Sequence, residues 1–165
     1  MVHPPPSIAL TTELAAYVVS GVSVVVGTRD AELFPEITRA WGPRVGRNRR
    51  DLSLCIAFAG NGRTLDNLRH NGQLAVTFAL PTNYRSIQLW GRCLGTGEPN
   101  REDRAAIAGH RDSFARLNET MGVPRAAIET LWQRELQESP GLIKIRFRAE
   151  RIFDQTPGPK AGSAL

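Results

Sequence analysis

Residues 60–64, with the sequence GNGRT, have the side-chain types of an anion-binding turn. An apolar run ends here and a helical pattern begins, so free backbone N–H groups gather at a helix start and favour a negative charge. The guanidinium of Arg63 and the hydroxyl of Thr64 add donors that suit a phosphate. The segment lacks the Walker A and GxGxxG spacings. The local sequence therefore leaves two interpretations open, a phosphate site and a plain strand-to-helix turn.

A second group of candidate side chains follows in residues 85–91, RSIQLWG. Their period of two predicts a strand with Ser86, Gln88 and Trp90 on one face. Such a face is either wet or covered by a partner or ligand. Trp90 beside Gln88 suits a planar heteroaromatic ligand, because the indole offers stacking area and the amide offers a donor and an acceptor. A solvated strand face with one large aromatic is the alternative.

The basic residues of the chain are almost all arginines. There are 21 Lys and Arg against 16 Asp and Glu, a net charge of +5, and the only lysines are Lys144 and Lys160. This balance is compatible with nucleic acid, a phosphorylated cofactor or an acidic substrate. Arginines cluster within residues 44–50, but no stacking aromatics interleave with them and no helix-turn-helix or zinc motif is present. We expect a solvated loop there and no nucleic-acid partner.

Nucleophilic and metal chemistry have little support in the sequence. No Ser-His-Asp or Cys-His set stands at an interpretable spacing, and the three histidines lack metal-ligand spacing. Cys55 and Cys93 lie far apart in apolar segments, which indicates free thiols in a reducing compartment. We therefore assign no catalytic residue and no metal site. No signal peptide is visible and the apolar run near residues 22–26 is too short for a membrane span, so we expect a cytoplasmic protein without a membrane partner.

The length of 165 residues and a hydrophobic content of 41% fit one globular domain over residues 1–165. Asn100 is expected to cap a helix, and a slip in alternation between Ala149 and Ile152 predicts a β-bulge. Short turns between strands favour antiparallel pairing, hence a small barrel with helices outside it. The patterns predict helices over residues 11–20, 63–71, 100–117 and 124–138. They predict strands over residues 22–28, 35–45 with an interruption near 42–43, 52–59, 74–80, 86–94 and from 143. An extended arm over residues 1–10 and a flexible tail over residues 156–165 complete the chain.

Residues 64–78, TLDNLRHNGQLAVTF, and then residues 85–91 resemble the pyridoxamine 5′-phosphate oxidase-like, FMN-binding split-barrel flavoproteins. Those proteins have an NLR-x-NP-x-(V/L)-A-(V/L) passage from helix to strand, followed by a strand with an arginine, a polar residue and a closing glycine. Residues 153–159 also resemble the tails of family members. The resemblance covers about residues 22–92 and the last strand. It implies a mainly β, α+β fold, a six-stranded antiparallel split β-barrel with flanking helices.

The same resemblance implies a homodimer with FMN at the subunit interface. It places the phosphate on Thr38 or Arg39 of the second strand and on Arg63 with Thr64 at the helix start. Thr64 stands where many members have lysine, so Arg63 and Arg39 would have to supply the missing charge. Ser86 stands where the oxidases carry glutamine near the flavin ring, and Gln88 is the expected substitute. The cofactor contacts implied in full are Thr38, Arg39, Arg63, Thr64, Asn67, Arg85, Ser86, Gln88 and Trp90.

Two segments depart from the true pyridoxamine phosphate oxidases. The tail from residue 155, QTPGPK, lacks their Arg- and Pro-rich end, and the helical insert over residues 101–138 is unlike them. We therefore expect an FMN-dependent oxidoreductase that acts on a different small-molecule substrate. The insert is expected to cover a barrel end or to widen the dimer contact. The alternatives are a non-catalytic flavin- or haem-binding module and a deazaflavin-dependent reductase.

Overall fold

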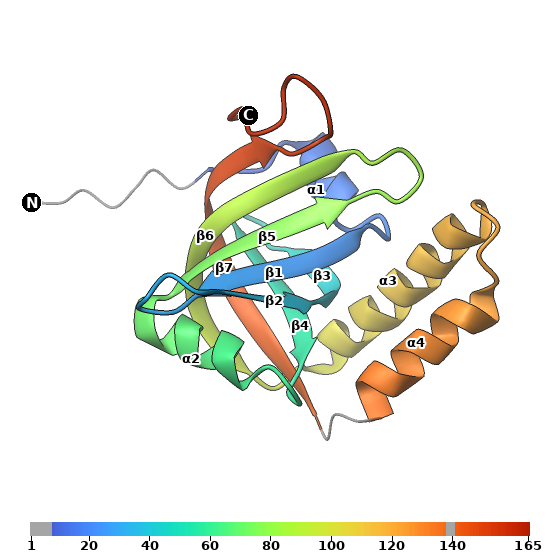
Figure 1. Cartoon of the computed structure of the whole chain (residues 1–165), viewed down its shortest axis with the longest axis horizontal. Helices are drawn as coiled ribbons and strands as arrows, with labels where there is room; N and C mark the ends of the chain where they lie inside the picture. Colours follow the sequence, from blue (N-terminus) through green and yellow to red (C-terminus); the bar gives the residue numbers. More distant parts are fainter. Residues whose placement is uncertain (1–7, 138–140) are drawn as a thin grey trace, which may run out of the picture.

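The structure, a computed structural model, describes residues 8–137 and 141–165 (Figure 1). Its strands form one curled antiparallel sheet in the order β2-β1-β5-β6-β7-β4-β3. The strands are β1 (Ser23–Arg29), β2 (Pro35–Arg39), β3 (Trp41–Val45), β4 (Asp51–Ala57), β5 (Gln73–Ala79), β6 (Ser86–Gly97) and β7 (Leu142–Asp154); the helices are α1 (Thr12–Val18), α2 (Gly62–Asn71), α3 (Arg101–Glu119) and α4 (Arg125–Gln137). In the described residues no helix is long and apolar enough to span a membrane.

The sheet has seven strands where six were predicted, because the expected strand over residues 35–45 divides at Ala40. β2 pairs with β1 and β3 pairs with β4, so the two halves lie at opposite edges of the sheet. The Ala40 N–H donates to the Val24 carbonyl at 3.0 Å, and Gly42 bends the chain with a φ of +59°. Since one residue joins the two edge strands, the sheet must curl until its edges meet. The expected α+β antiparallel barrel is therefore confirmed, with one more strand.

The barrel interior takes the alternate side chains of its strands. On β6, Ile87, Leu89 and Gly91 are buried while Ser86, Gln88 and Trp90 face outward, as the period of two predicted. The larger core comprises, among others, Val24, Val26, Leu54, Ile56, Val76, Phe78, Leu89, Ile145 and Phe147. α2 contributes Leu65 and Leu68 to this core from one side of the barrel.

The predicted bulge in β7 is confirmed at Glu150. Trp90 pairs with Arg151 whereas the next residue, Gly91, pairs with Ala149, so Glu150 is left without a partner on β6. The predicted cap of α3 is confirmed as well: the Asn100 side chain accepts the N–H of Asp103, whose carboxylate accepts the Asn100 N–H.

Both ends of the chain form hydrogen bonds with β7, although their composition suggested an extended arm and a flexible tail. The Ile8 N–H donates to the Ala149 carbonyl at 3.2 Å, while residues 1–7 of the expected arm lie outside the described residues. Residues 156–165 were expected to be a flexible tail. In the structure they turn back along β7, where the Asp154 N–H donates to the Ser163 carbonyl at 2.9 Å and Phe153 forms a bridge with Ala164.

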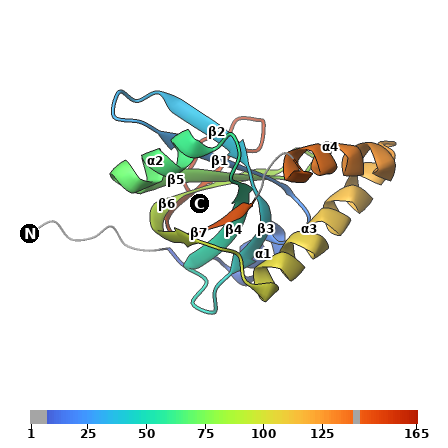
Figure 2. The ribbon, with the colours of Figure 1, turned by 90° about the horizontal axis from the view of Figure 1, so that it is seen from below.

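The insert forms a second core beside the barrel. α3 and α4 lie together on the side away from α2 (Figures 1 and 2). Trp41 of β3 packs edge-on against Trp132 of α4, with ring centroids 5.4 Å apart, and edge-on against Phe114 of α3 at 6.4 Å. Asp103, 1% exposed, fastens the start of α3 to the sheet through Lys144 at 2.8 Å. The final residue expected in this insert, 138, lies outside the described residues.

His110 connects α3 to the barrel as a neutral imidazole. The Gly42 N–H can only donate, so it must donate to an unprotonated Nδ1, at 3.2 Å, and Nε2 then carries the proton that it donates to the Val22 carbonyl at 2.7 Å. Burial lowers the pKa of His110 below its ordinary value.

This arrangement predicts acid sensitivity. The unfolded chain takes up a proton on His110 as the pH falls below about 6.5, while the folded chain resists it, so the free energy of unfolding should decrease with falling pH in this range. Urea titrations between pH 7 and 5 measure the effect. In a His110→Leu variant the decrease should be smaller, and an unchanged pH profile would contradict this assignment.

Candidate cofactor-binding site

A cleft of about 570 Å³ opens where β2 passes the start of α2. This space, the α2 cleft, is formed by the edge strand β2, the first residue of β3 and the turn that follows β4. Its lining residues are Ile37, Thr38, Arg39, Trp41, Ala57, Ala59, Gly60 and Asn61. The structure thus brings the two β2 residues of the predicted phosphate site to the turn that the sequence selected independently.

The N-terminus of α2 has no side-chain cap. Asn61 occupies the N-cap position, but its amide nitrogen donates backwards to the Ala57 carbonyl at 2.7 Å, and the first turn contains no acidic residue. A Cβ added at Gly60 or Gly62 would meet nothing within 4 Å, and the Gly60 φ of +76° suits glycine. The positive end of the helix dipole therefore meets an open turn, where the backbone can approach an anion closely.

Two arginines flank this turn from different elements. The Arg63 side chain is 86% exposed and its guanidinium lies 3.9 Å from the Glu36 carboxylate of β2. Arg39 is exposed at the end of β2, on the wall of the α2 cleft. Thr38 is half-buried, and its hydroxyl donates to the Arg39 carbonyl at 3.4 Å. These side chains can supply the donors that a phosphate requires.

Two predicted contacts on α2 point into the protein. Thr64 is fully buried, and its hydroxyl has no hydrogen-bond partner among the described residues. Asn67 is buried too, and its amide nitrogen donates to the Thr28 hydroxyl of β1 at 3.1 Å. Both lie on the helix face that carries Leu65 and Leu68. Asn67 therefore holds α2 against β1, and only the backbone of Thr64 faces the helix start.

The predicted ring contacts lie on the outer face of the sheet. The Trp90 indole N–H donates to Gln88 Oε1 at 2.7 Å, and Gln88 Nε2 donates to the Thr77 hydroxyl at 3.0 Å, so the amide of Gln88 has a fixed orientation. Trp90 is 46% exposed and packs on Phe153 and Arg151, at 5.1 Å and 5.2 Å from its ring centroid. This pair is rigid and presents an aromatic surface to whatever covers the sheet.

Arg85 and Ser86 lie at the other end of β6, beside α1. Arg85 pairs with Glu13 at 3.0 Å and stacks 4.8 Å above the Tyr17 ring. The Ser86 hydroxyl donates to the Tyr84 carbonyl at 3.0 Å. Neither residue lines the α2 cleft, and neither lines the second space, a hollow beside Trp90 on the outer face of the sheet. The structure therefore does not bring these two predicted contacts to the others.

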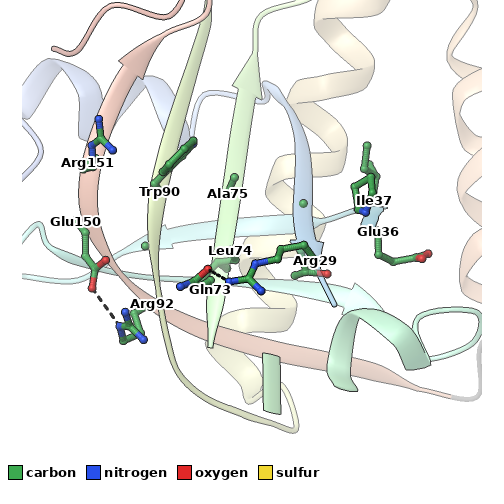
Figure 3. A pocket seen from close by; sticks show the side chains of 14 residues that line it. Arg29, Glu36, Ile37, Gln73, Leu74, Ala75, Trp90, Arg92, Glu150 and Arg151 are labelled. Carbon is green, nitrogen blue, oxygen red and sulfur yellow. Dashed lines mark hydrogen bonds and ion pairs between the residues drawn. The ribbon is translucent and has the colours of Figure 1, made fainter. Parts of the chain in front are cut away.

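Ile37 connects the two groups of candidate residues. An outer-face hollow of about 600 Å³ lies over β1, β2, β5 and β6, between Ile37, Ala75 and Trp90 (Figure 3). Polar pairs border it, Arg29 with Gln73 at 2.9 Å and the ion pair of Arg92 with Glu150 at 3.3 Å (Figure 3). Ile37 also lines the α2 cleft, so the two spaces adjoin.

The α2 cleft is also lined by Ile37, Trp41 and Asn61, which were not among the predicted site residues. Ile37 is 69% exposed. The alternation of Pro35, Ile37 and Arg39 in the predicted strand was a usable signal, because it places an isoleucine on the face that carries the arginine. Asn61 belongs to the turn over residues 60–64 that was predicted to bind an anion, but no contact was predicted for its side chain.

The arginine cluster of residues 44–50 does not form one patch. Arg44 turns to α3, where it pairs with Asp103 at 2.8 Å and with Glu102. Arg49 donates to the Thr12 hydroxyl at 3.0 Å.

Burial raises the pKa of the Cys55 thiol to about 11, so this cysteine is protonated at neutral pH and is not a nucleophile.

Solved structures with the same architecture exist, although the sequence matches no protein-family model and no curated protein. HupZ from Group A Streptococcus is 16% identical, with a TM-score of 0.55 over 93% of this chain and 100% of its own. A pyridoxinephosphate oxidase family protein from Clostridium acetobutylicum is 16% identical, with a TM-score of 0.50 over 85% of this chain and 83% of its own. This chain has the pyridoxamine 5′-phosphate oxidase-like split-barrel fold. An FMN-binding protein from Syntrophomonas wolfei shares the split barrel at 14% identity, with a TM-score of 0.51 over 86% of this chain and 83% of its own.

Proposed function

We propose that this split barrel binds flavin mononucleotide, with the phosphate at the N-terminus of α2. The observation that carries the proposal is the uncapped first turn of α2, which opens between Arg63 and the β2 wall of the α2 cleft. The solved FMN-binding protein of the same fold supports it.

The donors around this turn fit a phosphate. Backbone N–H groups of residues 62–64, the positive end of α2 and the guanidinium groups of Arg63 and Arg39 all favour a dianion. Because the Thr64 side chain is buried, we expect that residue to contribute its backbone N–H rather than its hydroxyl. The open space at Gly60 and Gly62 leaves room for phosphate oxygens near the backbone. The two arginines thereby replace the lysine that many members have at position 64.

When bound, flavin supplies hydride and electron transfer, so we propose an oxidoreductase that acts on a small molecule. The chain's own residues would hold and shield the cofactor. Arg63 and Arg39 fix the phosphate end, and the Gln88 amide, oriented by Thr77 and Trp90, offers polar contacts to the ring system.

We propose further that the cofactor lies between two copies of the chain. The phosphate donors line the α2 cleft, whereas Gln88 and Trp90 lie on the outer face, and Ile37 stands between them. Ile37 on this face is 69% exposed, and the turn between β1 and β2 exposes Leu33 by 70% and Phe34 by 69%, so apolar side chains are available for a contact with a second copy. A second copy would bury these side chains and bring its outer face to the partner's α2 cleft.

A titration of the purified protein with FMN, followed by flavin fluorescence and the visible spectrum, tests the cofactor. We expect quenched fluorescence and a perturbed flavin spectrum with saturable binding. A Soret band in the purified protein would instead establish haem. Binding of a deazaflavin in preference to FMN would replace the cofactor but keep the phosphate site. Absence of all three would overturn the proposal.

Light scattering tests the two-copy site. We expect a mass of twice 18.1 kDa at low micromolar protein. Ile37→Glu should shift the mass towards the monomer, since a carboxylate would be buried in the contact. A wild-type monomer that still binds FMN would exclude the shared site while leaving the phosphate assignment intact.

A further inference from the structure

A small cavity lies between the helical insert and the barrel, separate from the outer-face hollow. Its volume is about 200 Å³. An apolar cavity of about 150 Å³ is sufficient for benzene, so this space can hold one aromatic ring with a small substituent. Its walls come from β1, the β2–β3 junction, α3 and α4, and the lining residues include Arg39, Trp41, Phe114, Leu131 and Trp132.

Three aromatic rings form part of this wall. Trp41, Phe114 and Trp132 lie with centroids 5.4 to 6.4 Å apart, and Trp41 and Trp132 are only 6% and 3% exposed. Arg125 of α4 pairs with Asp112 of α3 at 3.1 Å across the contact between the two helices. The three rings pack on one another, and this packing holds them in place, so their edges and faces suit another planar ring.

The cavity adjoins the α2 cleft through two shared residues. Arg39 and Trp41 line both spaces. A guanidinium has only donors, so Arg39 favours a ligand whose substituent is an oxygen acceptor and disfavours a cation. Leu131, 50% exposed, marks the side of the cavity at which α4 meets solvent.

We propose that this cavity binds a single-ring aromatic molecule that carries an oxygen acceptor, with the ring against the wall formed by Trp41, Phe114 and Trp132 and the acceptor towards Arg39. The cavity adjoins the α2 cleft, where the phosphate is proposed, and among the described residues it shares no lining residue with the outer-face hollow beside Trp90, so we assign it no part in the proposed redox reaction. Binding of the ring by the cavity does not depend on the proposed function.

Benzamide is the probe, and benzylamine is its matched cationic analogue. In ¹⁵N-resolved NMR spectra of the flavin-free protein, benzamide should shift the indole N–H signals of Trp41 and Trp132 and leave that of Trp90 in place. Benzylamine should bind at least roughly tenfold more weakly, because it presents a cation to Arg39. Assignment uses single Trp→Phe variants.

A blocking variant and a control on the same helix complete the test. Leu131→Trp should raise the Kd for benzamide by roughly tenfold or more by filling the cavity's edge, whereas Thr130→Trp, on an exposed residue that does not line the cavity, should stay within about twofold. No shift of Trp41 and Trp132, or equal effects of the two variants, would overturn the proposal.

The same samples separate this inference from the flavin proposal. If FMN binds and benzamide does not, the cavity is not a ligand site and the cofactor assignment stands. If benzamide binds and FMN does not, the cavity is confirmed and the cofactor assignment fails.

Discussion

Replacing Arg63 with alanine should weaken FMN binding by about 1.5–3 kcal/mol, the contribution of a hydrogen bond to a charged group. This corresponds to a roughly 10- to 150-fold rise in Kd. Arg63 is the second residue of α2, so its charge adds to the helix dipole at the point where the backbone N–H groups converge. Flavin fluorescence measures the change directly.

The Arg63→Ala substitution should weaken FMN binding without reducing the stability of the folded protein. The Arg63 side chain is 86% exposed, and its ion pair with Glu36 spans 3.9 Å, so the pair contributes little to stability. Loss of affinity without loss of the folded state is therefore the expected pattern, and thermal unfolding in the absence of FMN verifies it.

Arg69→Ala is the matched control. Arg69 is an exposed arginine of the same helix, but it lies in the last turn and pairs with Asp66 at 3.0 Å. Its removal lowers the net charge equally and should leave the Kd within about twofold, because surface charges at this distance are screened by salt. Equal losses in the two variants would show a general effect of charge, and an unchanged Kd in Arg63→Ala would show that the phosphate lies elsewhere.

Local structural features could be predicted where they depend on residues that are neighbours in the sequence. The period of two over β6, the glycine turn before α2 and the capping box of Asn100 and Asp103 all depend on residues within one element. The orientation of Thr64 and Asn67 was predictable in the same way but was missed. Positions 64, 65, 67 and 68 share one helix face, and the two leucines show that this face is buried.

Pairing between distant elements was not predictable from the same patterns. The sequence predicts one strand over residues 35–45 with an interruption near residues 42–43, and only the pairing partners show that Ala40 separates two edges of the sheet. The Arg85 side chain was expected near a cofactor, but at the start of β6 it contacts Tyr17 and Glu13 of α1, which are far away in the sequence. The aromatic cavity likewise needs β3, α3 and α4 to meet.

Gly91→Ala should destabilise the fold by about 3 kcal/mol or more, towards or beyond the upper end of usual overpacking costs. A Cβ at this position would lie 2.2 Å from the carbonyl oxygen of Arg148 and 3.3 Å from the ring of Phe147. The bulge at Glu150 brings the backbone of β7 this close, and a backbone atom inside a paired sheet cannot move aside as a flexible side chain can. Urea unfolding measures the loss, and failure to recover folded protein is the same result in stronger form.

Gly97→Ala in the same strand is the control for this prediction. A Cβ there would meet nothing within 4 Å, so the substitution should change the unfolding free energy by less than about 0.5 kcal/mol. Comparable losses in both variants would show that β6 tolerates no side chain at either glycine. They would contradict the explanation that position 91 requires glycine because the β7 backbone lies close to it at the bulge. A selective loss at Gly91 would explain the closing glycine of the RSIQLWG segment physically: it lets β6 cross β7 closely while the neighbouring Trp90 stays on the outer face, where the proposed cofactor contacts lie.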